Sequence, residues 1–290
     1  MAALRDIKRQ ITAVQKTKQI TRAMNMVAAS KLRNAQLRME NFRPYALKFM
    51  DVLKSLALRV EPMSHPLLAV REPKRVKLIC MTSDRGLCGG YNSNIIKITE
   101  RFIREKLSQG KDVSIIAVGK KGRDYFRKKA NLINQHVDVF TKFDMSLAQS
   151  IGEDVIPSFI TEEYDELYLI YSEFFSLPIQ KPVVVRLLPI PSVDVEEGIE
   201  PDKRLEYIYE PSEEALLDQL MPMYLRVLIY RALLETSAGE NAARMMAMDN
   251  ATNNCDDMIQ TLTLNYNKAR QAAITKELMD IVGGTEALKG

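Results

Sequence analysis

The sequence contains little of the chemistry that enzymes use. Tryptophan is absent, histidine occurs only at His65 and His136, and cysteine only at Cys80, Cys88 and Cys255. So sparse and odd a cysteine count argues against a secreted disulfide framework. Two histidines without paired ligands support neither a zinc site nor a Ser-His-Asp or Cys-His nucleophile. We therefore expect no catalytic residue, no metal and no cofactor.

Long apolar runs and an excess of one charge are also missing. Hydrophobic residues make up 46% of the 290 residues and charged residues 27%, as in folded globular proteins. The net charge is only +4, which excludes a general nucleic-acid coat. The charged start MAALRDIKRQ lacks the apolar core of a signal peptide, and no stretch of about 18 apolar residues predicts a membrane span. The length predicts about two domains.

Residues 1–61 have the pattern of one long helix. They contain no glycine and a single proline, Pro44. Apolar residues recur at alternating steps of three and four, and the exceptions are consecutive: Lys18, Thr21 and Asn25. A seven-residue repeat of this length predicts a left-handed supercoil with a second helix. The alternative is a helix that lies on a globular domain, although such helices typically have about 8–20 residues.

Residues 212–283 repeat this pattern. Ser212, followed by two glutamates, is a good N-cap, and Gly283-Gly284 should end the helix before a tail at 284–290. Both helices adjoin the middle of the chain at their inner ends, so their pairing gives an antiparallel coiled coil. Polar residues interrupt the second apolar stripe at Ser237, Asn241 and Arg244.

Residues 74–190 have the alternating pattern of an α/β domain. Strand and helix signals alternate, which predicts a Rossmann-like domain with a largely parallel sheet and helices on both faces. The Pro-rich, acidic segment 191–211 reads as a linker to the second long helix. Strands are expected at 76–82, 113–118, 167–171 and 183–188, with a weaker one at 137–140, and helices at 91–108, 121–129 and 146–161.

The segment Ser83–Asn92, SDRGLCGGYN, follows the first predicted strand, where a dinucleotide-binding loop would lie. It lacks the GxGxxG spacing, so a tight turn is favoured over a phosphate-binding role. Asp84 and Arg85 are expected to pair with each other or to cap the helix. Cys88 precedes a helix, where thiols can become reactive, but a structural role is favoured. The turn would explain the three glycines, Gly86, Gly89 and Gly90.

The first helix carries an unbalanced basic face. Within residues 1–38 a single acid, Asp6, stands against nine cations, which favours an acidic protein partner or a polyanion over a merely solvated face. The cations are Arg5, Lys8, Arg9, Lys16, Lys18, Arg22, Lys31, Arg33 and Arg38.

Three segments resemble signatures of the gamma-subunit family of the F-type ATP synthase. They are Ile11–Lys31 (ITAVQKTKQITRAMNMVAASK), Ser83–Asn92 and Tyr266–Glu277 (YNKARQAAITKE). They occur in the family's order, and the resemblance covers the whole chain. It implies a non-catalytic central rotor shaft that carries torque from an ion-driven ring of c subunits to the catalytic beta subunits.

The resemblance also implies partners and a location. The expected partners are the alpha and beta subunits, the epsilon subunit and the membrane c ring, with no nucleic acid. The expected location is the cytoplasmic face of the bacterial inner membrane, as a peripheral protein. The linker before Pro211 has no cysteine, unlike chloroplast relatives, so no thiol switch is expected.

Site residues follow from the same resemblance. Tyr209 and Glu210 match a segment near the c ring and the epsilon subunit. The tip residues Ile281, Val282, Ala287 and Leu288 should lie in an apolar collar, although Gly284 stands where the family usually has alanine. Contact with the beta subunits is implied for Met24, Arg244, Arg270, Gln271, Thr275 and Glu277.

Two other functions remain open from the residues alone. In the first, the α/β domain belongs to a nucleotide-dependent enzyme that dimerises through a coiled-coil arm, and that enzyme would need Gly89 and Gly90 to bind nucleotide. In the second, a polyanion-binding coiled coil would lose its affinity for nucleic acid steeply with salt. The missing catalytic residues count against the first alternative, and the single basic arm weakens the second.

Overall fold

The computed structural model describes residues 2–57, 65–190 and 213–287. Two long helices, α1 (Ala2–Ala57) and α5 (Glu213–Ala287), begin and end this described chain. An α/β region lies between them in the sequence. The bounds of its elements are η1 Pro66–Leu68, β1 Arg75–Met81, α2 Tyr91–Ser108, β2 Asp112–Val118, α3 Lys120–Phe126, β3 Asn131–His136, α4 Met145–Ile160, β4 Glu166–Phe174 and β5 Gln180–Leu188.

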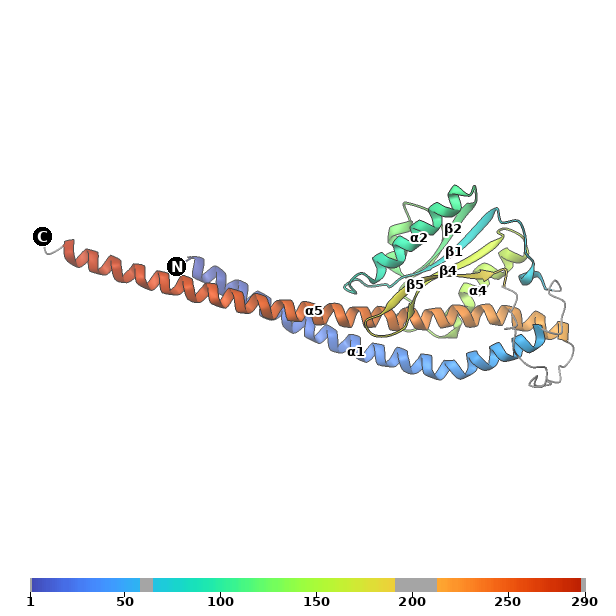
Figure 1. Ribbon diagram of the computed structural model, residues 1–290, viewed down its shortest axis with the longest axis horizontal. Coiled ribbons are helices and arrows are strands. Elements are labelled where there is room, and N and C mark those ends of the chain that lie inside the picture. Colours follow the sequence, from blue (N-terminus) through green and yellow to red (C-terminus); the bar gives the residue numbers. More distant parts are fainter. Residues whose placement is uncertain (1, 58–64, 191–212, 288–290) are drawn as a thin grey trace. The chain divides into compact units, whose positions relative to one another are not determined.

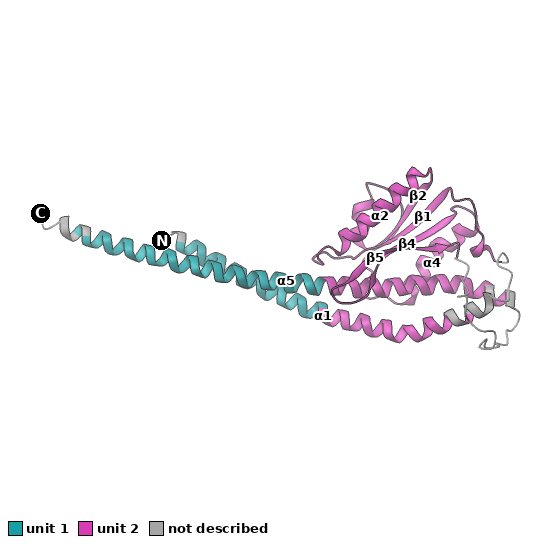
Figure 2. Ribbon diagram, in the orientation of Figure 1, with its two compact units in different colours: residues 1–28, 244–290 teal, residues 29–243 magenta. Residues whose placement is uncertain are grey.

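The chain divides into two compact units, and both long helices contribute to each (Figure 2). Unit 1 consists of Met1–Ala28 and Arg244–Gly290, and unit 2 of Ala29–Ala243. This division cuts through the helices, whereas the predicted boundaries at 61, 74, 190 and 212 separate whole helices from a central domain. The reason is that the inner parts of both helices bury side chains in the same core as the sheet of unit 2.

The strands of unit 2 form one sheet in the order β3-β2-β1-β4-β5. β1 is parallel to β2 and β4, and β2 is parallel to β3. Only β5 is antiparallel, to β4, because the few residues between these two strands allow a hairpin but not a parallel crossover. The predicted α/β fold with a largely parallel sheet is confirmed.

One predicted strand is wrong. The sequence favoured 137–140, but β3 is Asn131–His136, an edge strand whose polar residues (NLINQH) weaken its apolar signal. The residues that follow leave the sheet because Asp138 has a positive φ of 60° and donates its backbone N–H to Asp84. The predicted helices correspond to α2, α3 and α4, with α3 ending at Phe126 rather than at 129.

Helices cover both faces of the sheet (Figure 1). Leu78 and Cys80 of β1 face the core formed with α2 and α3. Ile79 and Met81 alternate with them and face the core formed with α4, α5 and part of α1. This alternation follows from the two-residue period of a strand. Because the sheet is buried on both faces, α5 is a structural layer of the α/β unit.

Unit 1 is an antiparallel pair of helices. The Lys18 ammonium pairs with the Asp256 carboxylate, and the Thr21 and Thr252 hydroxyls lie 2.8 Å apart. One turn further along α1, the Asn25 side-chain amide donates to the backbone carbonyl of Met245 at 3.0 Å. As the residue numbers increase along α1, the residue numbers of the partners in α5 decrease. This confirms the predicted antiparallel coiled coil.

The predicted ends of the long helices need one correction. α5 continues through Gly283 and Gly284 to Ala287, whereas the sequence placed its end at those glycines. A glycine inside a helix costs only about 1 kcal/mol relative to alanine, so it weakens a helix without having to end it. The N-cap Ser212, the linker 191–211 and the last predicted residues of the first helix, 58–61, lie outside the described residues.

Candidate functional site

Asp84 fills the position where a phosphate would be expected in the glycine-rich loop. One carboxylate oxygen accepts the backbone N–H groups of Lys120, at 3.1 Å, and Asp138, at 2.9 Å. The other oxygen accepts the N–H of Phe140 at 3.2 Å. These donors lie just beyond β2 and β3, where parallel sheets often bind anions. The chain's own carboxylate therefore occupies these donors, and Asp84 does not cap α2, whose N-cap is Gly90 without a side-chain hydrogen bond.

Replacing Asp84 tests this role. We expect Asp84→Ala to lower the free energy of unfolding by about 3 kcal/mol, because three backbone donors lose their acceptor. Asp84→Asn keeps one acceptor oxygen and should cost less than half as much. Chemical denaturation of both variants, followed by circular dichroism, measures the difference. Equal stability of Asp84→Ala and the parent chain would contradict this assignment.

Side chains within the loop hold it closed. The Asn92 carbonyl oxygen accepts the backbone N–H of Ser83 at 2.9 Å, and its amide nitrogen donates to Cys88 Sγ at 3.2 Å. The Ser83 hydroxyl donates to the backbone carbonyl of Arg85 at 2.6 Å. Of the loop's glycines, Gly89 has a positive φ, 57°, which favours glycine. The motif thus builds a compact turn, in agreement with the favoured interpretation.

α5 fills the crevice at which an open α/β sheet usually binds its ligand. The connections reverse direction between β1 and β4, and the carboxyl ends of these strands form the expected crevice. There the Tyr91 hydroxyl donates to the backbone carbonyl of Thr236 at 3.1 Å. Gly239 approaches so closely that a Cβ on it would lie 3.1 Å from the Tyr91 ring. The loop motif therefore places Tyr91 against α5.

All three cysteines are buried, with exposed fractions of 0% for Cys80, 2% for Cys88 and 8% for Cys255. Burial raises the pKa of the Cys80 thiol from 9.0 to about 12, and a hydrogen bond with Thr99 opposes this only in part. The burial of Cys88 agrees with a structural role.

The native chain should therefore react slowly with thiol reagents. At pH 8 the thiolate fraction of Cys80 is expected to be about a thousandfold lower than that of an ordinary cysteine. The folded chain keeps a proton that the unfolded chain releases, so this thiol's contribution to stability falls as the pH rises from 9.0 towards 12. Labelling with a thiol reagent, with and without denaturant, followed by peptide mapping, measures the ratio. Rapid labelling of Cys80 in the native chain would contradict its burial.

The polar interruptions in the seam of α1 pair across unit 1. Lys18 meets Asp256, Thr21 meets Thr252, and Asn25 meets a backbone carbonyl. Thr21 itself is buried, with 8% of its surface exposed. The polar side chains that interrupt the apolar seam of α1 therefore each have a partner on α5. Directional polar pairs inside a coiled coil favour one register over its alternatives.

The six residues expected at the beta-subunit contact fall into two groups within unit 1. Met24 and Arg244 are half-buried, at the level where Asn25 bonds to Met245. The other group is exposed on α5, and at about 1.5 Å per residue it begins about 39 Å further along that helix. It consists of Arg270, Gln271, Thr275 and Glu277.

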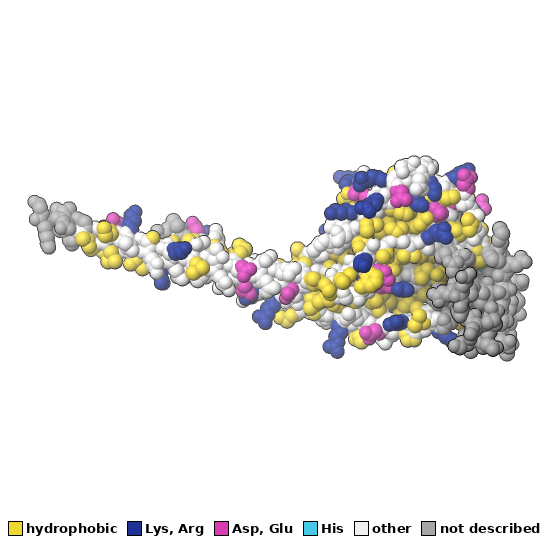
Figure 3. Space-filling model, in the orientation of Figure 1, with side chains coloured by type: hydrophobic (Ala, Val, Ile, Leu, Met, Phe, Trp, Pro, Cys, Tyr) yellow, Lys and Arg dark blue, Asp and Glu magenta, His cyan; other side chains and the backbone are white. Residues whose placement is uncertain are grey.

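The end of α5 has an exposed apolar face. α5 continues beyond the start of α1, and after Cys255 none of its described side chains is buried (Figure 1). Apolar side chains are visible between charged ones along this part of unit 1 (Figure 3). The four apolar residues Ile274, Leu278, Ile281 and Val282 are 49–63% exposed and share one helix face. Leu288, Tyr209 and Glu210 lie outside the described residues, as does the Ala287 side chain.

The basic face of α1 is only partly paired. Lys18 binds Asp256, and the Arg38 guanidinium donates to the backbone carbonyl of Phe143 at 2.6 Å and to the Tyr230 hydroxyl at 3.1 Å. The other cations expected on this face are exposed. They are Arg5, Lys8, Arg9, Lys16, Arg22, Lys31 and Arg33.

Comparison with known proteins identifies the family. The sequence model of the family described as ATP synthase matches residues 3–288. A protein of Syntrophus aciditrophicus named ATP synthase gamma chain is 66% identical over 288 residues, covering 99% of each chain. The chain belongs to the gamma-chain family of ATP synthase. A second relative with that name, from Nitratidesulfovibrio vulgaris (strain Miyazaki F), is 51% identical over the whole of both chains.

Solved structures with the same fold come from this family's complexes. A chain of the Tetrahymena thermophila mitochondrial ATP synthase, in a structure of its central stalk and c ring, is 28% identical with a TM-score of 0.58. The match covers 80% of this chain and 99% of that one. A chain of the Euglena gracilis mitochondrial ATP synthase, 20% identical, has the same fold with a TM-score of 0.70 and covers 99% of this chain and 95% of its own.

Two further findings concern the described residues. None of the helices there is both long enough and apolar enough to cross a bilayer. Within residues 2–57, 65–190 and 213–287, no three His, Cys, Asp or Glu side chains gather where they could hold a metal ion.

Sequence reasoning missed the partners of the polar seam residues and the role of Tyr91. Thr252 and Asp256 directly follow Ala251 and Cys255, which are apolar seam positions of the second helix, so they were not counted as seam residues. A polar side chain next to a seam position is the signal that could have identified them. Nothing in the sequence pairs Tyr91 with Thr236, because 145 residues separate them.

Proposed function

We propose that this gamma chain is the non-catalytic rotating shaft of an F-type ATP synthase. In this role it transmits torque between an ion-driven ring of c subunits and the catalytic beta subunits, in the direction of ATP synthesis or, in reverse, of ATP-driven ion pumping. Its partners would be the alpha and beta subunits, the epsilon subunit and the c ring. It would lie on the cytoplasmic face of the bacterial inner membrane without spanning it.

The observation that carries the proposal is that one helix, α5, is part of both the core of unit 2 and the helical pair of unit 1. Its first part, with Leu225 and Leu233, is in the core beneath the sheet of unit 2. Its second part forms the helical pair of unit 1. A torque applied to the α/β unit would act directly on a helix buried in its core, since rotation of that helix alone would break close packing. An enzyme's dimerisation arm has no need of this integration.

The lack of catalysis is supported by what fills the expected ligand site. Asp84 occupies the backbone donors beyond β2 and β3, and Tyr91 meets α5 at the crevice between β1 and β4. A nucleotide phosphate placed there would meet a carboxylate, and like charges at that distance repel strongly.

Two exposed surfaces of unit 1 suit the proposed partners. Exposed cations of α1, such as Arg9 and Lys16, would face acidic groups at the lower edge of the beta subunits. The apolar end of α5, with Ile281 and Val282, would lie in an apolar collar of the alpha and beta subunits. The structure that contains the Tetrahymena relative is of the central stalk and c ring, which supports the c ring as a partner.

Reconstitution tests the proposal. The chain is combined with alpha and beta subunits of a close relative, and a bead is attached through an introduced cysteine on the exposed face of α2, at Glu105. We expect ATP to drive stepwise rotation of the bead in one direction. In a matched control assembly, a bead attached to a beta subunit of the immobilised hexamer should not rotate.

Two results would contradict the proposal. Hydrolysis of ATP by the assembled hexamer without bead rotation would remove the shaft role. Hydrolysis of ATP by the chain alone, abolished by Gly89→Val, would favour the enzyme instead.

A further inference from the structure

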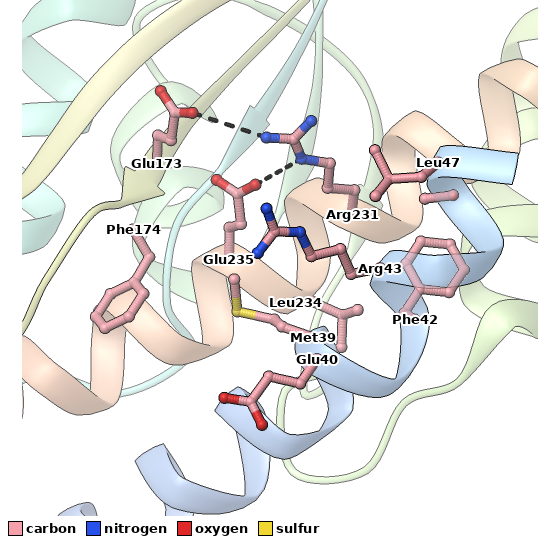
Figure 4. A pocket seen from close by; sticks show the side chains of 11 residues that line it. Met39, Glu40, Phe42, Arg43, Leu47, Glu173, Phe174, Arg231, Leu234 and Glu235 are labelled. Atoms are coloured by element: carbon pink, nitrogen blue, oxygen red, sulfur yellow. Dashed lines mark hydrogen bonds and ion pairs between the residues drawn. The ribbon is translucent and has the colours of Figure 1, made fainter. Parts of the chain in front are cut away.

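A cavity of about 420 Å³ lies within unit 2 between α1, the end of β4 and α5 (Figure 4). Its volume is in the range of about 300–1,000 Å³ that is typical of small-molecule sites. Apolar side chains line much of it, including Phe42 and Leu47 of α1, Phe174 of β4 and Leu234 of α5. The proposed function uses none of these residues.

One carboxylate oxygen in this cavity has no hydrogen-bond partner among the described residues. Glu235 of α5 is 3% exposed, and its Oε1 accepts a hydrogen bond from Arg231 Nε at 2.8 Å. Its Oε2 is buried and has no hydrogen-bond partner among the described residues. A buried acceptor left unsatisfied costs about 1–3 kcal/mol, so its retention calls for an explanation.

The charges around Glu235 favour a cation over an anion. α1 contributes Glu40 and Arg43, β4 contributes Glu173, and α5 contributes Arg231 and Glu235 itself. Arg231 interacts with two carboxylates, because its guanidinium also lies 3.8 Å from a carboxylate oxygen of Glu173. With every group ionised, the carboxylates outnumber the guanidinium groups by one.

The pKa of Glu235 also favours a cation over an anion. Burial raises this pKa above its ordinary value of 4.5, and this is the largest effect. Arg231 and the backbone amide of Phe174 lower the pKa, whereas Glu173 raises it. The protein therefore stabilises the ionised carboxylate less than water does. A cation beside Oε2 would supply the missing stabilisation.

We infer that this cavity binds a small organic cation, whose primary ammonium group donates to Glu235 Oε2 and whose apolar part packs against Phe42 and Phe174. An ammonium group offers three donors and a positive charge, which the unpartnered oxygen and the surplus carboxylate both favour. Aromatic rings add a favourable interaction with a nearby cation. The bound ligand would touch α1, β4 and α5 together.

The experiment uses the purified full-length chain and phenethylammonium chloride as the probe, with titration calorimetry at low ionic strength. We expect a dissociation constant at or below about 1 mM, as is reasonable for a ligand of this size. 2-Phenylethanol and phenylacetate have the same ring without the positive charge, and both should bind at least tenfold more weakly. Equal binding of either compound, or no binding of the amine, would overturn the inference.

Variants locate the site. Glu235→Gln keeps the shape of the side chain and should weaken amine binding at least tenfold, whereas Glu105→Gln, on the exposed face of α2, should leave it unchanged. Leu47→Trp fills the cavity from a side chain that is 56% exposed, so it should abolish binding without disturbing the core. Thermal unfolding of each variant verifies that it is folded. Unchanged binding by both Glu235→Gln and Leu47→Trp would overturn the inference, and the test needs no partner subunit, so the rotor proposal is judged separately.

Discussion

Gly119→Ala should destabilise unit 2 far more than the same substitution at Gly86 within the glycine-rich motif. Gly119 connects β2 to α3 with a φ of 96°, and a Cβ at this position would lie 2.1 Å from the backbone oxygen of Thr82. No side-chain movement relieves a collision with backbone, so β1 and β2 would have to separate. We expect a loss of about 3 kcal/mol or more in the free energy of unfolding, and a midpoint roughly 6–12 °C lower.

Two further glycines are controls for this effect. Gly110 also has a positive φ, 75°, but a Cβ there would meet nothing within 4 Å, so Gly110→Ala should cost only about 1 kcal/mol of backbone strain. Gly86 lies in the motif, and its Cβ would come no closer than 3.7 Å to the Lys121 side chain. Gly86→Ala should therefore change stability by about 0.5 kcal/mol or less. Calorimetric unfolding ranks the three variants by their midpoint temperatures. A midpoint of Gly119→Ala equal to that of Gly110→Ala would contradict the predicted collision with Thr82.

Met24→Lys should uncouple ATP hydrolysis from ion pumping in the assembled complex. Met24 is half-buried in unit 1, one residue from the Asn25 contact to α5. A new ammonium group there would add a cation to the basic face of α1, which under the rotor proposal turns past acidic groups of the beta subunits. A close charge pair across an interface is worth about 1.5 kcal/mol or more, enough to hold one rotational position about tenfold longer.

The measurement is the number of ions pumped per ATP hydrolysed in reconstituted vesicles. We expect this ratio to fall severalfold while the assembled complex forms in normal amount. Met26→Lys places the same charge on an exposed side chain two residues away, and Met24→Leu keeps the volume without the charge. Both should stay near the parent ratio. An equal loss in Met26→Lys would show that added charge anywhere on this helix suffices and would contradict the placement of the contact at Met24.

The local features of the fold followed from the sequence because they depend on neighbours in the chain. Seven-residue periodicity predicted both long helices, and short apolar runs predicted four of the strands. The prediction of a strand at 137–140 was wrong because a contact from Asp84, distant in sequence, draws Asp138 out of the sheet. The predicted end of α5 was wrong because glycine weakens a helix only by about 1 kcal/mol.

Only the parts of the site that belong to a recognisable sequence motif could be predicted. The glycine-rich turn was interpreted correctly as compact, but its use of Asp84 as an internal anion was not, since the three amide donors come from other parts of the chain. Met24 and Arg244 came from family resemblance, and so did the exposed residues of α5. That Met24 and Arg244 lie at one level of the coiled coil, far from Arg270, required the pairing of the helices.

The amino-acid sequence by itself determined that this chain has two long heptad helices, one on each side of an α/β region in the sequence. Periodicity and composition are properties of the chain, so no coordinates are needed to read them. The tertiary structure alone decided that α5 is shared between the core of the α/β unit and the helical pair. It also decided that the buried Glu235 lies beside a cavity, with one oxygen that has no hydrogen-bond partner in the part of the chain that the structure describes. Such facts depend on which distant residues meet, and burial and hydrogen bonding act between those residues whatever their separation in the chain.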